Sequence, residues 1–409
     1  MTWKLSLAYG SSRARHDELS WRRYPINSRS CIVLLAFLLG GCGGSLYIAE
    51  PFEPASLDVR AVEQTKQGAR VKAAVPGADE TQAIFGLPLY EQGIQPIWLE
   101  ITNATGQELR YAPVGTDREY FSALEVAYMN RSGYSGESLR VMEERMLELA
   151  MPRDIEVGGT ASGFVLTHLQ PGTKGFNVDL FGDESGIRFT FFLDVPGFMP
   201  DHSEVDFEQL YAAEDVVQVA TADLYAYLRR APRSAKDAAG NEAGSPINVV
   251  LIGQGHDLLY ASLRAGWHEV AAPATATAGS NDDFLFGRVQ DATFRHAGGA
   301  NDGSYELRVW LSPATTDDVP IWLGQLKHVI DHRWIDAIPD PDTEGALFFL
   351  LQNLWYGESL MKHGWILLGD ASAGEEYFAT NLRGVLWLSA DPVELDAVDT
   401  VDWDYPEVE

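Results

Sequence analysis

The first half of the chain alternates apolar and polar residues in short runs. Ile97–Ile101 (IWLEI) and Phe176–Leu180 (FNVDL) follow the two-residue period of a strand with one buried face. Turn-forming residues such as Asn103–Gly106 separate the runs. The predicted strands are Arg70–Val75, Ile94–Asn103, Glu108–Ala112, Phe121–Met129, Thr160–His168, Gly175–Phe181 and Ile187–Val195. Seven short strands of this kind favour an antiparallel β-sandwich that resembles immunoglobulin-like domains.

Two segments of the first 245 residues have a helical pattern. Gly136–Met151 places Leu139, Met142 and Met146 three or four residues apart, which predicts an amphipathic helix. Asp223–Arg230 (DLYAYLRR) is expected to form a second, shorter helix. The following residues, 231–245, lose hydrophobicity and gain Gly, Ala and Ser, so we expect the boundary between two domains there.

The second half has a different pattern. Pro246–Gly253 is a continuous apolar run, as expected for a strand that is buried on both faces. His256–Gly266 and Glu344–Met361 are predicted helices. Further strands are predicted at Phe284–Arg295, Tyr305–Leu311, Val319–Ile330, His363–Leu368 and Asn381–Leu388. This order predicts an α/β domain, a mixed sheet with two helices, and an α+β class for the whole chain.

The N-terminal residues have the pattern of an export signal. Basic residues precede the apolar run Ile32–Leu39, and small residues follow it. Leu39–Cys42 (LGGC) resembles the bacterial lipobox, which implies cleavage before Cys42 and a lipid on its thiol. Gly43, in place of Asp, then implies sorting to the outer membrane. The alternative is a single uncleaved membrane anchor, because Cys31–Ala49 approaches the length of a bilayer span.

Charge limits the partners that we expect. Cleavage before Cys42 removes six of 30 basic and two of 59 acidic residues, which leaves 24 and 57 and a formal net charge of −33. No basic stripe is visible in the sequence, so nucleic-acid binding is not expected. The acidity also disfavours peripheral binding to anionic lipid, so the lipid on Cys42 is the predicted attachment to the membrane. The only other cysteine, Cys31, lies in the signal, so disulfides are not expected.

These observations divide the chain into six predicted segments. They are a signal peptide (1–41), a tether (42–68), a β-sandwich (69–200), a helical segment with a linker (201–245), an α/β domain (246–390) and an acidic tail (391–409). The tail carries eight acids and no basic residue, and its Trp403 and Tyr405 could dock back onto the fold.

The α/β domain resembles the LssY C-terminal domain, which is found in bacterial envelope proteins of undefined activity. The matching stretches are Ser245–Gly253, Arg264–Trp267, Phe286–Asp291, Leu307–Leu311, Ile321–Gln325, His332–Asp342, Leu351–Leu354 and Leu382–Ser389. Family members often carry an N-terminal lipoprotein or membrane segment, or a fused PAP2-type phosphatase. No PAP2 motif is visible here. Gly345-Ala346 stands where the family has a basic residue, which weakens any charged site at that point.

One cluster of residues suggests metal chemistry. His328 and His332 would share a face of a strand, and with Asp331 or another nearby carboxylate they could bind zinc or another divalent metal. Such a metal could activate water for hydrolysis. In the alternative interpretation His328 is an ordinary polar residue at a strand end and His332 lies in a loop.

Two function hypotheses follow. The first is a non-catalytic envelope lipoprotein that binds or scaffolds a protein or glycan partner and needs no cofactor. The second is a metal-dependent hydrolase that uses His328 and His332 with a carboxylate.

Overall fold

The computed structural model describes most of the chain after the export signal. The described residues are 45–183, 186–237, 240, 246–271, 283–297, 303–332, 335–340, 342–368 and 382–403. The signal and Cys42 therefore lie outside the described residues. The fold is mixed α/β, with several antiparallel sheets, as the sequence predicts at this level. Within the described residues, no helix has both the length and the apolar character that a membrane span needs.

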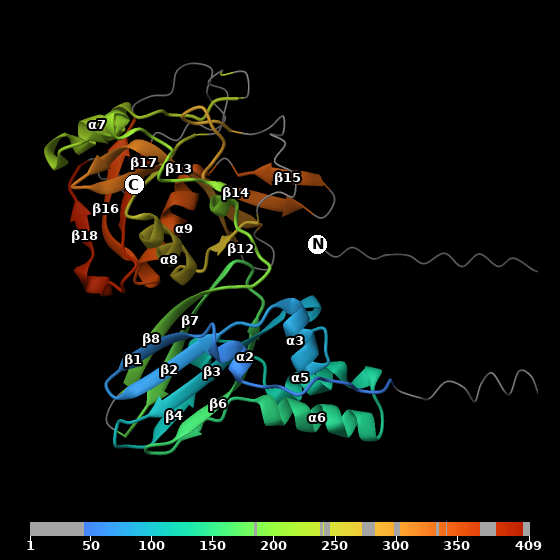
Figure 1. Cartoon of the computed structure of the whole chain (residues 1–409). Coiled ribbons are helices and arrows are strands. Elements are labelled where there is room, and N and C mark those ends of the chain that lie inside the picture. Colours follow the sequence, from blue (N-terminus) through green and yellow to red (C-terminus); the bar gives the residue numbers. More distant parts are fainter. Residues whose placement is uncertain are drawn as a thin grey trace, which may run out of the picture.

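Two four-stranded antiparallel sheets form the first part of the molecule (Figure 1). The strand order of one is β1 (Val62–Lys66), β2 (Ala69–Ala74), β3 (Ile94–Asn103), β6 (Thr160–His168). The order of the other is β5 (Asp154–Ile155), β4 (Leu109–Ala112), β7 (Thr173–Phe181), β8 (Gly186–Asp194). Alternate apolar side chains of both sheets, such as Ile97, Leu99 and Phe189, join one buried cluster. The two-residue period thus produces a core shared by both sheets.

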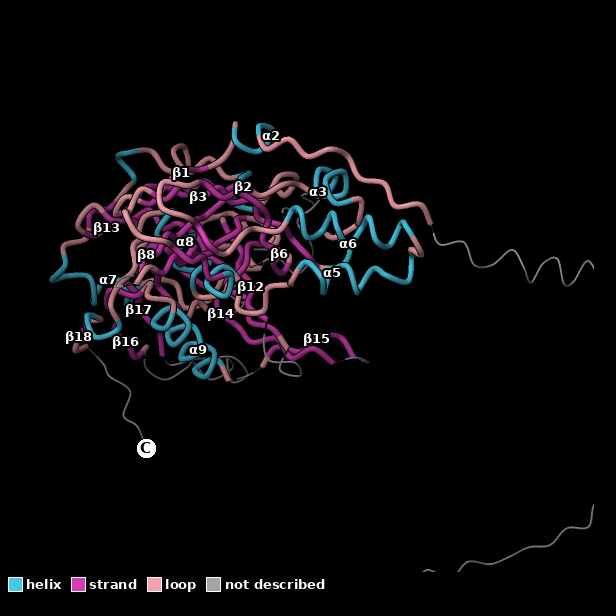
Figure 2. The backbone as a smooth tube through the Cα atoms, turned by 90° about the horizontal axis from the view of Figure 1, so that it is seen from below, coloured by secondary structure: helices cyan, strands magenta, loops and turns pink. Residues whose placement is uncertain are grey.

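Helices α3 (Ala78–Phe85), α5 (Ala123–Asn130) and α6 (Glu137–Leu149) lie together beside these sheets (Figure 2). They pack on Trp98 and Phe164 through a second apolar cluster. The predicted strand Phe121–Met129 is wrong, because most of it is helix α5. The reason is local: the Ser122 side chain accepts from the Glu125 amide and the Glu125 side chain accepts from the Ser122 amide, a capping box that starts a helix.

The predicted tether is also wrong over its described part. The Tyr47 hydroxyl donates to the Phe85 carbonyl at 2.6 Å, and Leu57, in the short helix α2 (Ala55–Asp58), is fully buried. Val62–Lys66 forms β1, which pairs with β2. Polar, proline-containing composition did not reveal that these few apolar residues attach the segment to the core.

One ten-stranded mixed sheet organises the second part of the molecule. Its main path is β11 (His268–Glu269), β12 (Ala292–Ala297), β13 (Ser304–Thr316), β14 (Val319–His332), β10 (Val249–Ile252), β17 (Leu382–Leu388), β16 (Leu360–Leu367) and β18 (Asp399–Val401). β15 (Ile335–Pro339) pairs with β14, and β9 (Val217–Gln218) pairs with β13. Helices α8 (Gly255–Arg264) and α9 (Thr343–Tyr356) share one core with it. Helix α7 (Leu224–Arg230) belongs to a separate apolar cluster on the opposite face.

Three predictions for this part need correction. Residues 217–237, assigned to the helical segment and linker, pack on the ten-stranded sheet: β9 pairs with β13, and Ala235 is fully buried. Strand β12 begins only at Ala292, not at Phe284, and α9 ends at Tyr356 rather than at Met361.

The acidic tail is partly structured. β18 runs parallel to β16, and Trp403 packs near Tyr225 and Trp387. Docking of Trp403 is therefore confirmed, whereas Tyr405 lies outside the described residues.

The two parts meet through a small polar and aromatic junction. The Phe192 and Tyr260 rings stack with centroids 4.1 Å apart. The Glu269 carboxylate accepts from the Thr173 amide at 2.5 Å and contacts His202 Nε2 at 2.5 Å. Because Thr173 precedes Glu269 by 96 residues, these contacts hold the two parts of the chain together.

Candidate functional site

Of the three residues predicted to bind a metal, His328, Asp331 and His332, the structure describes the side chain of His328 alone. His328 lies in β14, where Nδ1 is 2.9 Å from Asp340 Oδ2 and the ring stacks on Tyr305 at 4.4 Å. The β14–β15 pairing shifts register between Ile330 and His332, with the extra residue on β15. The side chains of Asp331 and His332 lie outside the described residues. Among the residues whose positions are described, no group of three His, Cys, Asp or Glu side chains could hold a metal ion.

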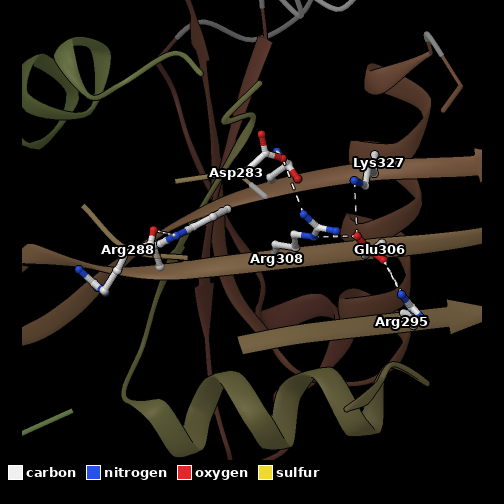
Figure 3. Close-up of polar contacts among 8 residues, drawn as sticks. Asp283, Arg288, Arg295, Glu306, Arg308 and Lys327 are labelled. Atoms are coloured by element: carbon white, nitrogen blue, oxygen red, sulfur yellow. Dashed lines mark hydrogen bonds and ion pairs between the residues drawn. The ribbon is translucent and has the colours of Figure 1, made fainter. Parts of the chain in front are cut away.

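A charged network lies on the sheet face that carries the α7 cluster (Figure 3). Arg295, Glu306 and Lys327 are direct cross-strand neighbours on β12, β13 and β14. Thr293, Arg308 and Gln325 form the next row. Glu306 and Arg308 share a face with Trp310, which packs in the α7 cluster, because side chains two residues apart point the same way.

Glu306 is the centre of the network. Its carboxylate lies 3.0 Å from Arg295 Nη2, 2.8 Å from Arg308 Nε and 3.5 Å from Lys327 Nζ (Figure 3). Burial alone would raise the pKa of Glu306, but the attraction of Arg308, Lys327 and Arg295 outweighs it and lowers the pKa below its ordinary value. Glu306 is therefore ionised at neutral pH and orients three cations.

Asp283 links this network to a neighbouring pocket. Its carboxylate accepts from Gln325 Nε2 at 2.8 Å and lies 3.7 Å from Arg308. The next residue, Phe284, exchanges two backbone hydrogen bonds of 2.8 Å with Lys236. Asp283 and Phe284 thus lie between the network and the segment that follows α7.

The pocket has a volume of about 1050 Å³ and a basic wall. Its lining includes Arg229, Arg230, Arg233 and Lys236, and among the described lining residues Asp237 is the one acid. Pockets of this size hold small organic ligands. We call the pocket and the Glu306 network together the basic face, defined by its seven cations: Arg229, Arg230, Arg233, Lys236, Arg295, Arg308 and Lys327.

Arg383 anchors the basic wall of the pocket to the sheet. Its side chain is fully buried and donates to the carbonyls of Leu228, Pro232 and Ile247. Burial, together with repulsion from Arg233, lowers the pKa of Arg383 to about 10. Arg383 therefore stays charged at neutral pH and ties the end of α7 to the sheet.

The basic face was not predicted from the sequence. Arg229, Arg230, Arg233 and Lys236 stand in the segment predicted as a linker, and the other three cations come from separate strands. The available signal was the spacing of four basic residues within eight positions of an acidic chain.

Comparisons with known proteins add no assignment. No family model matches the chain. No curated protein matches it either.

Proposed function

We propose that this protein is a non-catalytic envelope lipoprotein whose C-terminal part binds a phosphate- or carboxylate-bearing ligand on the basic face. One observation carries the proposal: seven of the 12 basic residues after position 200 gather there. Among the described residues, the face has seven basic residues and three acidic ones, Asp237, Asp283 and Glu306, a surplus of four positive charges. In a chain of net charge −29, such a surplus favours an anionic ligand at this place.

The remaining parts of the proposal come from the sequence. Lipidation at Cys42 would attach the chain to the outer membrane, and an immunoglobulin-like sandwich would space the C-terminal domain from it. The core shared by the two four-stranded sheets supports the sandwich. The resemblance to the LssY C-terminal domain supports an envelope location and leaves the activity open.

The first experiment measures retention of the full chain on heparin, which serves as a polyanionic probe. We expect replacement of Arg229, Arg230 and Lys236 by Ala to lower the salt concentration at which the protein elutes, because these cations line the pocket. The matched control replaces Arg70, Arg110 and Arg140, which are exposed in the N-terminal part, and changes the net charge equally. Equal losses in both triple variants would contradict the proposal.

The attachment is tested separately. Cys42→Ala should abolish signal cleavage and incorporation of labelled palmitate. A wild-type chain that is released without lipid would contradict this part of the proposal and leave the basic face untouched.

The hydrolase hypothesis has its own test. Substitution of His328 and His332 by Ala, followed by measurement of bound zinc, distinguishes it from the binding hypothesis. Unchanged metal content would remove it.

A further inference from the structure

A cleft of about 700 Å³ lies between the two parts of the molecule. One wall comes from β7 and β8, including Asn177, Asp179 and Arg188. The opposite wall comes from the ends of α8 and α9, including Arg264 and Tyr356. Figure 1 shows β7 and β8 below α8 and α9. Clefts between domains are frequent ligand sites, and this volume is within their usual range.

The wall formed by β7 and β8 presents polar side chains that are hydrogen-bonded to one another. Asn177 and Thr190 are cross-strand partners, and Thr190 Oγ1 donates to Asn177 Oδ1 at 2.8 Å. In the next row the Asp179 carboxylate accepts from Arg188 Nε at 2.8 Å and Nη2 at 3.3 Å. None of the described residues accepts from Asn177 Nδ2, so this amide retains donors for a ligand.

The wall formed by the ends of α8 and α9 has a buried arginine and an exposed aromatic ring. Arg264 donates through Nε to Ser359 and through Nη2 to the Ser389 carbonyl, but its buried Nη1 has no partner among the described residues. Tyr356 is 66% exposed, and its ring lies parallel to that of Trp355, with an interplanar angle of 6°. The exposed Tyr356 ring provides an apolar surface at the cleft.

The charges that line the cleft cancel. Its lining contains three arginines and three acids: Arg118, Arg188, Arg264, Asp117, Asp179 and Glu358. The cleft therefore differs from the basic face and does not favour an ion. Planar amide, carboxylate and guanidinium groups beside an exposed ring instead suit a ligand with many hydroxyls and an apolar ring face.

We propose that this cleft binds an uncharged oligosaccharide. The Asn177 amide and the Asp179–Arg188 pair bond its hydroxyls, and the Tyr356 ring packs on a sugar face. This site is separate from the basic face and goes beyond the function proposed above.

The experiment screens the full chain against an array of neutral oligosaccharides of gluco, galacto, manno and N-acetylhexosamine types, and then titrates the binders by calorimetry. We expect saturable binding that Tyr356→Ala and Asn177→Asp each weaken at least tenfold. Asn177→Asp keeps the size of the side chain and removes the amide donor. The matched control is Tyr128→Ala, because Tyr128 is 62% exposed on α5, away from the cleft.

The outcomes separate the two proposals. Binding that survives the Arg229/Arg230/Lys236 variant but is lost in Tyr356→Ala supports the cleft. Binding of charged glycans only, of no glycan, or equal weakening by Tyr128→Ala and Tyr356→Ala overturns it. Circular dichroism of each variant confirms that the fold is retained.

Discussion

The basic face and the interdomain cleft contain the same kinds of charged side chain but differ in their balance of charge. On the basic face, one buried carboxylate, Glu306, orients three cations and leaves positive charge in excess. In the cleft, Arg188 has its own carboxylate in Asp179, and the lining carries no net charge. The number of cations at a site therefore says little about the ligand that it binds. The ratio of cations to nearby carboxylates decides whether an ion or a neutral polar molecule is favoured.

The largest effect that separates the two regions is expected from removing their central carboxylates. Glu306→Gln should lower the free energy of unfolding by about 3 kcal/mol, because it leaves three cations around a neutral, mostly buried group. Asp179→Asn should cost only about 1 kcal/mol, because its one partner, Arg188, is mostly exposed. Urea denaturation measures the free energy of unfolding of both variants. Equal costs would contradict the central role of Glu306.

Glu306→Gln should also tighten heparin binding, because the positive surplus of the basic face increases by one. Weaker binding by a folded Glu306→Gln variant would show that orientation of the cations matters more than their charge.

A buried cation on β7, Lys174, gives the next effect. Burial lowers the pKa of Lys174 to about 8, although attraction from Asp117 opposes the shift; its ammonium donates to the His168 carbonyl at 2.6 Å. Below pH 8 the folded chain must bury the charge, whereas above pH 10.5 Lys174 is neutral in both states. Stability should therefore rise by about 2 kcal/mol between these pH values.

Lys174→Met tests this assignment. It should stabilise the chain at pH 7 by a similar amount and remove that part of the pH dependence, as measured by urea denaturation at pH 7, 9 and 10.5. A pH profile that is parallel to that of the wild type would contradict it.

Salt should distinguish the ligands of the two regions. Raising the salt concentration from 50 to 200 mM should weaken heparin binding about tenfold, because screening reduces the attraction of exposed charges. Oligosaccharide binding in the cleft should change less than about twofold, because the ligand carries no charge for salt to screen. Calorimetry in both buffers measures the salt dependence of heparin binding and of oligosaccharide binding. A similar salt dependence for both ligands would contradict the prediction.

The smallest effect is expected from loosening the junction. Burial would raise the pKa of Glu269, but hydrogen bonds from His202 and Thr173 outweigh it and lower the pKa. Glu269→Gln should therefore weaken oligosaccharide binding about threefold by loosening one wall of the cleft, with heparin elution unchanged. If both binding activities fall together, Glu269 supports the C-terminal part as a whole.

The local pattern of apolar and polar residues predicts many of the strands and helices. The two-residue period predicted Ile94–Asn103 and Thr160–His168 with the limits that the structure has, because one face of each strand must be buried. The continuous apolar run around Val249–Ile252 predicted a central strand, and β10 lies between β14 and β17. The period failed at Phe121–Met129, where the Ser122–Glu125 capping box outweighed it.

The sites and the extent of the folded units depend on pairing between remote segments. Arg295, Glu306 and Lys327 become neighbours through the registers of β12, β13 and β14, and the cleft exists because β7 and β8 pack near the ends of α8 and α9. A sequence reports which residues carry charge, but their interaction depends on distance and burial, which are set by pairing between remote segments. For the same reason the net charge of −29 does not predict the local surplus of positive charge on the basic face.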